Sequence, residues 1–337
     1  MKEIISSLVG GKNMSAQDAK KAIKTIMSGQ SNDIEITALL TGLKIKGETP
    51  EEIASFARVM REYALKIEPK VLGTLVDMCG TGGDKSNTFN ISTTAMFIVA
   101  GAGIPVAKHG NRAMTSKCGS ADVLEALGVD LSIGPEKIRK SIEDVGIGFM
   151  FAPMHHSATK YVMPVRKALG YRTVFNILGP LTNPANARAQ LMGVYDPGLT
   201  EKLAEVFRIL GLERAMVVHG MPELDELSTI GKTKISELKE GKLNTYYISP
   251  EEYDLARADM KNLLGGTPQE NAVILKNILK GVDTGPKRDI ALLNAAAGIL
   301  VGGKADDLGA GLSIAEEVLE DGRAYKKLCE YVKYCGK

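Results

Sequence analysis

A run of glycines follows the first strongly apolar stretch of the chain, with the sequence DMCGTGGD at residues 77–84. Glycines let backbone N–H groups come close to an anion and form a concave nest for phosphate oxygens. The spacing matches neither GxGxxG nor the P-loop motif, which argues against a dinucleotide-binding fold and a nucleoside triphosphatase. The run predicts a phosphate site, although a glycine-rich turn is also often purely structural.

Four small polar side chains come soon after this run. Thr88, Asn90, Ser92 and Thr93 stand just before an apolar stretch that reads as a helix. Ser92 is well placed as the N-cap of that helix, and a helix N-terminus is itself a site for anions. Simple capping accounts for one of these residues, and the other three favour phosphate binding.

A third group follows the next apolar stretch, with KHGNR at 108–112 and TSKCGS at 115–120. Cations, amides and hydroxyls at the end of a parallel strand stand where open α/β sheets bind ligands. Lys108 can neutralise phosphate charge, and Ser120 can cap a helix against another phosphate. A solvated basic loop is the alternative, which Asn111 and the glycines make less attractive.

Two further groups suit a metal ion and a carboxylate. Asp225 and Glu226 are adjacent acids, and pairs of hard oxygen ligands suit Mg²⁺ bridged to substrate phosphates. Adjacent acids are more often merely solvated, so the phosphate elements carry this interpretation. Arg166 can hold a carboxylate with two hydrogen bonds, and the Gly-Pro turn at 179–180 can wall an aromatic slot.

The four histidines and four cysteines add little chemistry of their own. The cysteines form no CxxC motif and no Cys/His cluster, which argues against zinc and a disulfide framework. Cys79 resembles a nucleophile by position, but a buried residue ending a strand is the better interpretation because no base stands near it. Each histidine is as readily structural as functional; they are His109, His155, His156 and His219.

These groups need a scaffold, and the first part of the chain reads as helices. Helices are expected at 16–27, from 32 or 33 to 43, and at 53–65 after the capping box TPEE at 49–52. From residue 75 short apolar runs alternate with amphipathic segments, which indicates β/α units on a mostly parallel sheet. Strands are expected at 75–78, 104–107, 147–151, 191–194 and 215–218, with a further one at 243–248. Further helices are expected at 92–99, 121–127, 135–145, 200–210, 268–279, 289–300 and 314–332.

The pattern predicts two unequal domains. Residues 1–70 form a small helical domain, and 71–337 form a larger α/β domain with a mostly parallel sheet flanked by helices. A Pro- and Gly-rich stretch interrupts the alternation over 158–184, so part of 156–185 is expected to join the helical domain. The 337 residues suffice for one large domain and a smaller one.

Composition excludes several classes of protein. The net charge of +2 gives no global attraction to nucleic acid or to an anionic membrane. The first 13 residues lack the apolar core of a signal peptide, and no apolar run reaches the length of a membrane span. We therefore expect a soluble, cytoplasmic protein that binds neither nucleic acid nor membranes.

Taken together, five ordered motifs resemble those of the anthranilate phosphoribosyltransferases of tryptophan biosynthesis. They are GTGGD at 80–84, NIST at 90–93, KHGNRAMTSKCGSAD at 108–122, FNILGPLTNP at 175–184 and the acids 225–226. The resemblance covers nearly the whole chain. It implies transfer of the 5-phosphoribosyl group from phosphoribosyl diphosphate to the amine of anthranilate, in a cleft between the domains of a homodimer that uses Mg²⁺, two ions per subunit. It also implies a fold of the nucleoside phosphorylase/phosphoribosyltransferase type.

The resemblance also implies a role for each motif residue. Catalysis is assigned to Asp84, Lys108 and Arg166, and the metal to Ser92, Asp225 and Glu226. The anthranilate contacts are Gly80, His109, Asn111, Arg166 and Pro180. Phosphoribosyl diphosphate is assigned to Gly80, Thr81, Gly82, Gly83, Asp84, Thr88, Asn90, Ile91, Ser92, Thr93, Lys108, His109, Gly110, Asn111, Arg112, Ala113, Met114, Thr115, Ser116 and Ser120.

Two rival functions are weighed against this one. A pyrimidine nucleoside phosphorylase is expected to carry Lys-His-Ser before its Thr-Gly-Gly, whereas DMC stands at 77–79 here. A non-enzymatic relative that binds nucleic acid should show a basic excess and eroded metal acids, and this chain shows neither. A protein that only binds phosphate is disfavoured for the same reason.

Overall fold

The computed structural model describes residues 1–84, 86–113 and 116–336. Helices form its N-terminal end, and three of them begin at caps that the sequence predicts. Ser15, Asn32 and Thr49 each accept a hydrogen bond from the backbone N–H three residues later. The first helix was not expected, and it begins after Met1 without a side-chain cap. The bounds are α1 Lys2–Val9, α2 Ala16–Met27, α3 Asp33–Lys46 and α4 Pro50–Tyr63.

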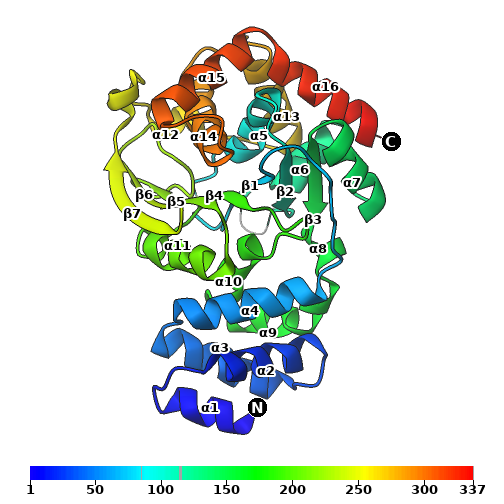
Figure 1. The fold of residues 1–337 in the computed structure, drawn as a ribbon, viewed down its shortest axis with the longest axis vertical. Helices are drawn as coiled ribbons and strands as arrows, with labels where there is room; N and C mark the ends of the chain where they lie inside the picture. Colours follow the sequence, from blue (N-terminus) through cyan, green and yellow to red (C-terminus); the bar gives the residue numbers. More distant parts are fainter. Residues whose placement is uncertain (85, 114–115, 337) are drawn as a thin grey trace.

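A mostly parallel sheet forms the centre of the larger part, which confirms the predicted fold class (Figure 1). In the described residues the strand order is β3-β2-β1-β4-β5-β6-β7. The pairs β5–β6 and β6–β7 are antiparallel. The strand β6 was missed because only two of its seven residues, Ile235 and Leu238, are large and apolar. The bounds are β1 Val76–Gly80, β2 Val106–Gly110, β3 Ile147–Phe151, β4 Ala189–Gly193, β5 Arg214–Gly220, β6 Thr233–Lys239 and β7 Lys242–Ile248.

Helices cover both faces of this sheet. The helices α5, α13, α14, α15 and α16 pack in one apolar cluster with strand residues such as Met78, Leu191 and Met216. On the other face α7 packs on β3, and α11 packs on β5, β6 and the helix α4. The bounds are α5 Ile91–Gly101, α6 Ser120–Ala126, α7 Pro135–Asp144, α11 Leu199–Leu210, η3 Pro250–Tyr253, α12 Met260–Leu263, α13 Pro268–Leu279, α14 Pro286–Val301, α15 Leu308–Glu320 and α16 Arg323–Cys335.

One expected helix and two expected strands differ from the structure. The helix expected at 314–332 is broken between α15 and α16, where Gly322 has a φ of +79°. The strands β1 and β2 continue to Gly80 and Gly110, beyond their expected ends. Successive side chains of a strand point to opposite faces. The neighbours Lys108 and His109 therefore lie on opposite faces of the sheet instead of sharing a loop.

The chain returns to the helical end between β3 and β4. Leu65 donates its backbone N–H to the His155 carbonyl, and Ile67 donates to the Pro184 carbonyl. In Figure 1 the α10 part of this returning segment lies between the sheet and α4, and the α9 part lies among the N-terminal helices. Among the described residues, no helix combines the length and the apolar character needed to cross a membrane. The short elements are α8 Ala152–His155, η1 Ser157–Tyr161, α9 Met163–Leu169, α10 Phe175–Leu178 and η2 Gly179–Leu181.

Candidate active site

Glycines end four of the strands, and three of these glycines make room for the loop that carries the acid pair. A Cβ at Gly193 would lie 1.5 Å from the Asp225 carbonyl oxygen, and one at Gly80 would lie 2.4 Å from Asp225 Oδ2. A Cβ at Gly220 would lie 2.6 Å from the Glu226 carbonyl oxygen. All three distances are shorter than any that real Cβ atoms show. These strand ends must therefore be glycine for the acids to lie across β1, β4 and β5.

The acid pair closes over the glycine loop and the start of α5. Asp225 Oδ2 accepts a hydrogen bond from the Gly82 N–H at 2.7 Å, and Glu226 Oε1 accepts one from the Ser92 N–H at 3.2 Å. Burial, followed by the charges of Asp84 and Glu226, raises the pKa of Asp225 well above its ordinary value. Burial also raises the pKa of Glu226, to about 7. A bound cation would stabilise the charged forms of both carboxylates.

Lys108 lies beneath this pair, and its position corrects the expected phosphate-facing loop. Its side chain is buried on the α5 face of β2, where Nζ donates to the Met78 carbonyl and, at 3.1 Å, to Ser92 Oγ. Its charge lowers the pKa of Glu226, against the larger effect of burial. The positive charge of Lys108 therefore partly offsets the negative charge of the acid pair.

The glycine loop has the backbone conformation that its composition suggests. Gly82 and Gly83 have φ values of +67° and +79°, a region that disfavours other residues. The Asp84 carboxylate accepts hydrogen bonds from the Ser86 N–H at 3.2 Å and from the Ser86 hydroxyl at 2.6 Å. Thr81 donates its N–H to the Gly193 carbonyl at 2.9 Å, which joins the loop to the end of β4. The loop is held at both ends.

The start of α5 differs from expectation. Asn90, and not Ser92, is the N-cap, and its side chain makes no cap hydrogen bond. Instead Asn90 Nδ2 donates to the Cys118 carbonyl at 3.2 Å, and Asn90 Oδ1 accepts from Asn271 Nδ2 at 2.9 Å. The prediction of Ser92 as N-cap is wrong because the helix begins at Ile91, so its N-cap lies two residues earlier.

Three neighbours of Asn90 are also predicted site residues. The side chains of Ile91 and Thr93 are buried in the core. Thr88 forms an isolated β-bridge to Leu264, in the segment after α12. Ile91 and Thr93 can therefore contact phosphate, as predicted, only through their backbone groups.

The loop after β2 is folded tightly on α6. Gly119, and not Ser120, is the N-cap of this helix, so the capping prediction for Ser120 is also wrong. Ser120 Oγ instead donates to the Asn111 carbonyl at 3.3 Å. Asn111 and Ser120, both predicted to bind the substrate, thus join the loop to the helix.

An ion-pair cluster fixes the next residue of this loop. Arg112 pairs with Asp122 at 3.0 Å and with Glu125 at 2.8 Å. The predicted residues Gly110, Ala113 and Ser116 belong to the described part of the chain, whereas the predicted residues Met114 and Thr115 lie outside the described residues. Arg112 is therefore engaged by protein carboxylates in this structure.

The opposite face of β2 carries a second set of groups. His109 Nδ1 lies 3.1 Å from the Gly179 carbonyl, to which it must donate, so Nε2 is the unprotonated nitrogen. The His156 ring lies 5.0 Å from it, and in the described structure neither buried Nε2 has a partner. Burial lowers the pKa of His109 to about 3 and that of His156 to about 4. Both rings are neutral at physiological pH.

Sequence reasoning did not single out His156, and the signal for it is spatial. Its neighbour His155 makes a structural contact, because Nδ1 bonds the Leu65 carbonyl at 2.7 Å. His219 likewise bonds the Val194 carbonyl at 2.8 Å. An unpartnered nitrogen close to the His109 ring is what sets His156 apart from these two.

The structural interpretation of Cys79 agrees with its surroundings. Burial raises the pKa of the Cys79 thiol well above its ordinary value, and the nearby charge of Asp77 raises it further. A thiol with a raised pKa forms little of the reactive thiolate. Cys79 is therefore a buried strand residue and no nucleophile.

Arg166 and Pro180 belong to the returning segment. The Arg166 guanidinium lies 5.8 Å from the centre of the Phe175 ring, and burial lowers its pKa. Within the described residues Arg166 makes no ion pair, so a carboxylate can approach it. Pro180 is buried, and its carbonyl accepts from Gln190 Nε2 at 2.7 Å.

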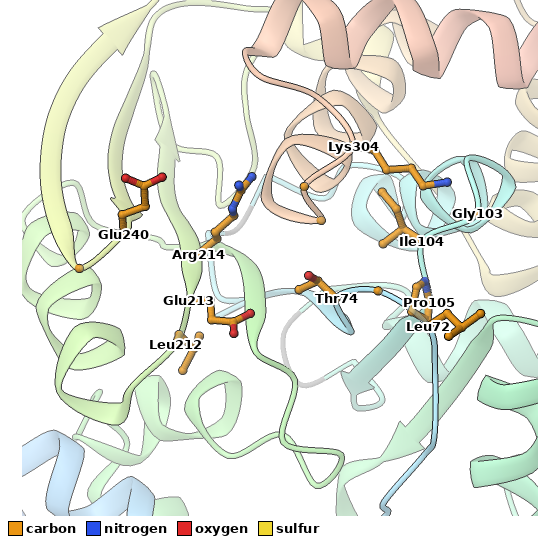
Figure 2. Close-up of a pocket in the computed structure, with 14 residues that line it drawn as sticks. Leu72, Thr74, Gly103, Ile104, Pro105, Leu212, Glu213, Arg214, Glu240 and Lys304 are labelled. Carbon is orange, nitrogen blue, oxygen red and sulfur yellow. The ribbon is translucent and has the colours of Figure 1, made fainter.

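A large cavity lies elsewhere, at the amino ends of the strands (Figure 2). It has a volume of about 910 Å³ and is lined by residues that include Glu213, Arg214 and Lys304. Lys304 Nζ donates to the Ala102 carbonyl at 2.6 Å, Arg214 donates to the Leu300 carbonyl, and Glu213 pairs with Arg188. These three charges already have partners, whereas the imidazole Nε2 atoms of His109 and His156 at the carboxyl edge have none in the described structure.

Comparison with known proteins finds relatives over nearly the whole chain. The models of a glycosyl transferase family match residues 2–64 as its helical bundle domain and 72–325 as its a/b domain. A curated anthranilate phosphoribosyltransferase of Methanocorpusculum labreanum is 53% identical over 97% of this chain and 95% of its own length. One of Acetivibrio thermocellus is 49% identical over 99% and 96%.

Solved structures agree with these relatives. The anthranilate phosphoribosyltransferase of Thermus thermophilus has a TM-score of 0.94 at 42% identity, covering 98% of this chain and 99% of its own. The Saccharomyces cerevisiae enzyme in complex with PRPP and Mg has a TM-score of 0.89 at 28% identity, over 99% and 97%. The same yeast enzyme has been solved with 4-fluoroanthranilate, with a TM-score of 0.87 at 28% identity, over 99% and 97%.

Proposed function

The chain belongs to the anthranilate phosphoribosyltransferase family, and from this we infer that it transfers the 5-phosphoribosyl group of phosphoribosyl diphosphate to the amine of anthranilate and releases diphosphate. The reaction is a step of tryptophan biosynthesis. One observation carries the assignment to this site. The partly buried acids Asp225 and Glu226 are held over the start of α5 and over a glycine loop that can offer N–H groups to phosphate oxygens.

The enzyme uses Mg²⁺, and we propose that Asp225, Glu226 and Ser92 hold it, with two ions per subunit. The fit rests on chemistry, because two hard carboxylates with raised pKa values gain from a divalent cation. Among the described residues no cluster of three or more acidic, His or Cys side chains is suited to a metal. The remaining ligands are then substrate oxygens and water, as Mg²⁺ prefers. The yeast relative solved with PRPP and Mg supports this use.

On the donor side we propose that the glycine loop and the loop after β2 bind phosphoribosyl diphosphate. In the loop at 80–84 the N–H groups of Gly83 and Asp84 are offered to the substrate, because those of Thr81 and Gly82 already have protein acceptors. The side chains of Thr88, Asn111 and Ser120 offer further polar groups. Strand ends that lie side by side support this grouping, because β1 and β2 are neighbours in the sheet.

Two of the predicted donor-side residues are proposed to shape the site instead of touching the substrate. Asn90 is held by Cys118 and Asn271, and Arg112 is held by two carboxylates of α6. Their polar groups already have protein partners in this structure. They would keep the start of α5 and the loop after β2 in position.

On the acceptor side we propose that anthranilate lies against His109, His156 and Pro180, with its carboxylate on Arg166 and Asn111. The two neutral imidazoles support this, because an unpartnered Nε2 lone pair can accept a hydrogen bond from the amine. An aromatic amine is already unprotonated at neutral pH, so orientation is the main requirement. Orientation by Arg166 and by the imidazoles therefore replaces a strong general base.

The proposed mechanism follows from this arrangement. The anomeric carbon loses diphosphate through an oxocarbenium-like transition state, and negative charge grows on the leaving group. Bound Mg²⁺ supplies a Lewis acid for that charge. The N–H groups of Gly83 and Asp84 bind the leaving group, and Lys108 keeps Ser92 and Glu226 in place beneath it. Asp84, held by Ser86, is proposed to orient the same loop.

We also propose a homodimer that pairs the outer faces of α1 and α3. Val9, Ile34 and Ile45 are 76%, 81% and 82% exposed there. Large apolar side chains on one exposed module indicate a partner surface. A second copy is the occupant favoured by the resemblance. Ile34→Glu combined with Ile45→Glu should give a monomer by light scattering, and an unchanged dimer would contradict this interface.

The remaining proposals concern domains and location. The proposed boundary near residue 70 fits the two family models, which match 2–64 and 72–325. Contacts of α9 with α3 and of η1 with α2 support the proposal that part of 156–185 joins the helical domain. The larger domain then spans 71–337. A cytoplasmic location fits a biosynthetic enzyme of this family.

The assignment is tested by following the loss of anthranilate fluorescence with phosphoribosyl diphosphate and Mg²⁺. Turnover that needs both substrates and the metal is expected. Folded protein that is silent with anthranilate would overturn the assignment. Turnover that persists in a chelator would overturn only the metal.

A further inference from the structure

Residues 171–172 connect three parts of the molecule. The Tyr171 hydroxyl lies 2.7 Å from Thr41 Oγ1 of α3, which belongs to the helical end. The Arg172 guanidinium donates to the Gly83 carbonyl of the glycine loop and lies 3.8 Å from the centre of the Tyr195 ring, just after β4. Two adjacent side chains thus link a helix of the small module to the loop proposed to bind diphosphate.

Arg172 contacts a loop whose glycines have no side chains that could fix its backbone conformation. A Cβ at Gly83 would lie 3.4 Å from Arg172 Nη2, so the guanidinium lies directly against this glycine. Gly82 and Gly83 have φ values of +67° and +79°. As glycines they have no side chains that could fix their peptide planes. Gly82 is tied to Asp225 on one side, and Gly83 is tied to Arg172 on the other.

This second tie sets the direction of a donor. In a trans peptide the N–H points opposite to the C=O of the same plane. Because the Gly83 carbonyl is turned toward Arg172, the N–H of Asp84 points away from it. A planar guanidinium stacked on an aromatic ring keeps a fixed orientation better than an ammonium would. Arg172 therefore orients a backbone donor without touching the substrate itself.

We propose that Arg172 is a positioning residue of this enzyme, which presents the glycine loop to phosphoribosyl diphosphate and, through Tyr171, couples that loop to the helical module. The inference rests on the proposed function. Arg166, which is assigned to the acceptor, stands six residues earlier, so the same segment reaches both substrates. Sequence reasoning assigned no role to Tyr171 or Arg172.

The decisive measurement is the separate KM for each substrate in Arg172→Ala, after wild-type turnover has been established. The KM for phosphoribosyl diphosphate should rise on the order of 10- to 100-fold, as for a lost hydrogen bond from a charged donor. The KM for anthranilate should change less than about threefold, and added guanidinium ion should restore part of the loss. Arg172→Lys should not restore it, because an ammonium lacks the stacked fork.

Controls separate this role from simple stability. Arg208→Ala removes an exposed arginine paired with Glu205 and should leave both KM values unchanged. Arg172→Met keeps the length of the side chain on Tyr195 if the alanine variant fails to fold. Tyr171→Phe, which loses the bond to Thr41, should raise the same KM severalfold, and no further when combined with Thr41→Val.

Three results would overturn the proposal: an unchanged KM for phosphoribosyl diphosphate in a folded Arg172 variant, equal rises for both substrates, or no response to guanidinium. A silent wild type would instead remove the proposed function on which it rests. Active wild-type enzyme with an indifferent Arg172 would remove the positioning role alone.

Discussion

The amino edge of the sheet, where its parallel strands begin, can be compared with the carboxyl edge, where they end. Both edges are lined by glycines and both carry charged side chains. At the amino edge Lys304 and Arg214 hold the carbonyls at the ends of α5 and α14. At the carboxyl edge the adjacent acids Asp225 and Glu226 are partly buried and have raised pKa values, and two buried imidazole nitrogens lack partners in the described structure. The large cavity is at the first edge and the chemistry is at the second. Unsatisfied buried groups, and not cavity volume, identify the site.

The largest effect is expected from the acid pair. Asp225→Asn combined with Glu226→Gln should lower turnover at least on the order of a thousandfold, the upper end of what one lost charge-stabilising group costs. The melting temperature should not fall, because two partly buried carboxylates that repel each other are removed. Anthranilate fluorescence and a thermal melt measure the two effects. Near-normal turnover in the double variant would contradict the assignment of the chemistry to the carboxyl edge.

Arg166→Ala should affect the acceptor. The KM for anthranilate should rise on the order of 10- to 100-fold, because a carboxylate loses its charged hydrogen-bond donor. The KM for phosphoribosyl diphosphate should change far less, which is the reverse of the result expected for Arg172→Ala. Steady-state kinetics with each substrate varied in turn give both constants. Equal rises would remove the assigned role.

A pair of glycine variants compares the edges directly. Gly193→Ala places a Cβ where the Asp225 carbonyl stands, so it should cost about 1–3 kcal/mol of stability and displace the acid pair, with turnover reduced at least roughly tenfold. Gly241→Ala, beside the amino-edge cavity, meets open space at a φ of +74°. It should cost about 1 kcal/mol for its backbone conformation and leave turnover unchanged. Denaturant unfolding and the turnover assay distinguish them.

The buried imidazoles predict a dependence of stability on pH. His156 has a folded pKa of about 4, below its ordinary value, so its contribution is complete above about pH 6.5 and is lost as the pH falls toward 4. At about pH 5 this loss is about 2 kcal/mol relative to about pH 7.5. His156→Asn should lack that part of the decline when unfolding is measured at both values. A decline of the same size in the variant would contradict the buried neutral ring.

The smallest effect is expected at the amino edge. Lys304→Ala removes a cation from the C-terminal carbonyls of α5 and should cost about 0.3–1 kcal/mol of stability. Turnover should stay within about twofold of wild type, because nothing at that edge is assigned to the reaction. A large loss of turnover with normal stability would show that the amino-edge cavity takes part in function.

Much of this molecule could be predicted from local sequence. The caps at Ser15, Asn32 and Thr49 and the glycines at 82–83 act within a few residues of themselves, so their patterns identify helix starts and a left-handed loop. Short apolar runs between amphipathic segments predicted the parallel sheet. The strand β6 escaped because its sequence is largely polar, and α1 escaped because it has no side-chain cap.

The sequence by itself determined which residue types are present for phosphate, metal and carboxylate chemistry, since that depends on side-chain composition and local backbone freedom. Tertiary structure decided how they meet. Gly82 and Asp225 are 143 residues apart, and Arg172 and Gly83 are 89 apart, so their contacts exist only once the strand ends lie side by side. The exact end of β2 likewise decided that Lys108 faces the acid pair while His109 faces the acceptor side, because neighbouring side chains of a strand point in opposite directions.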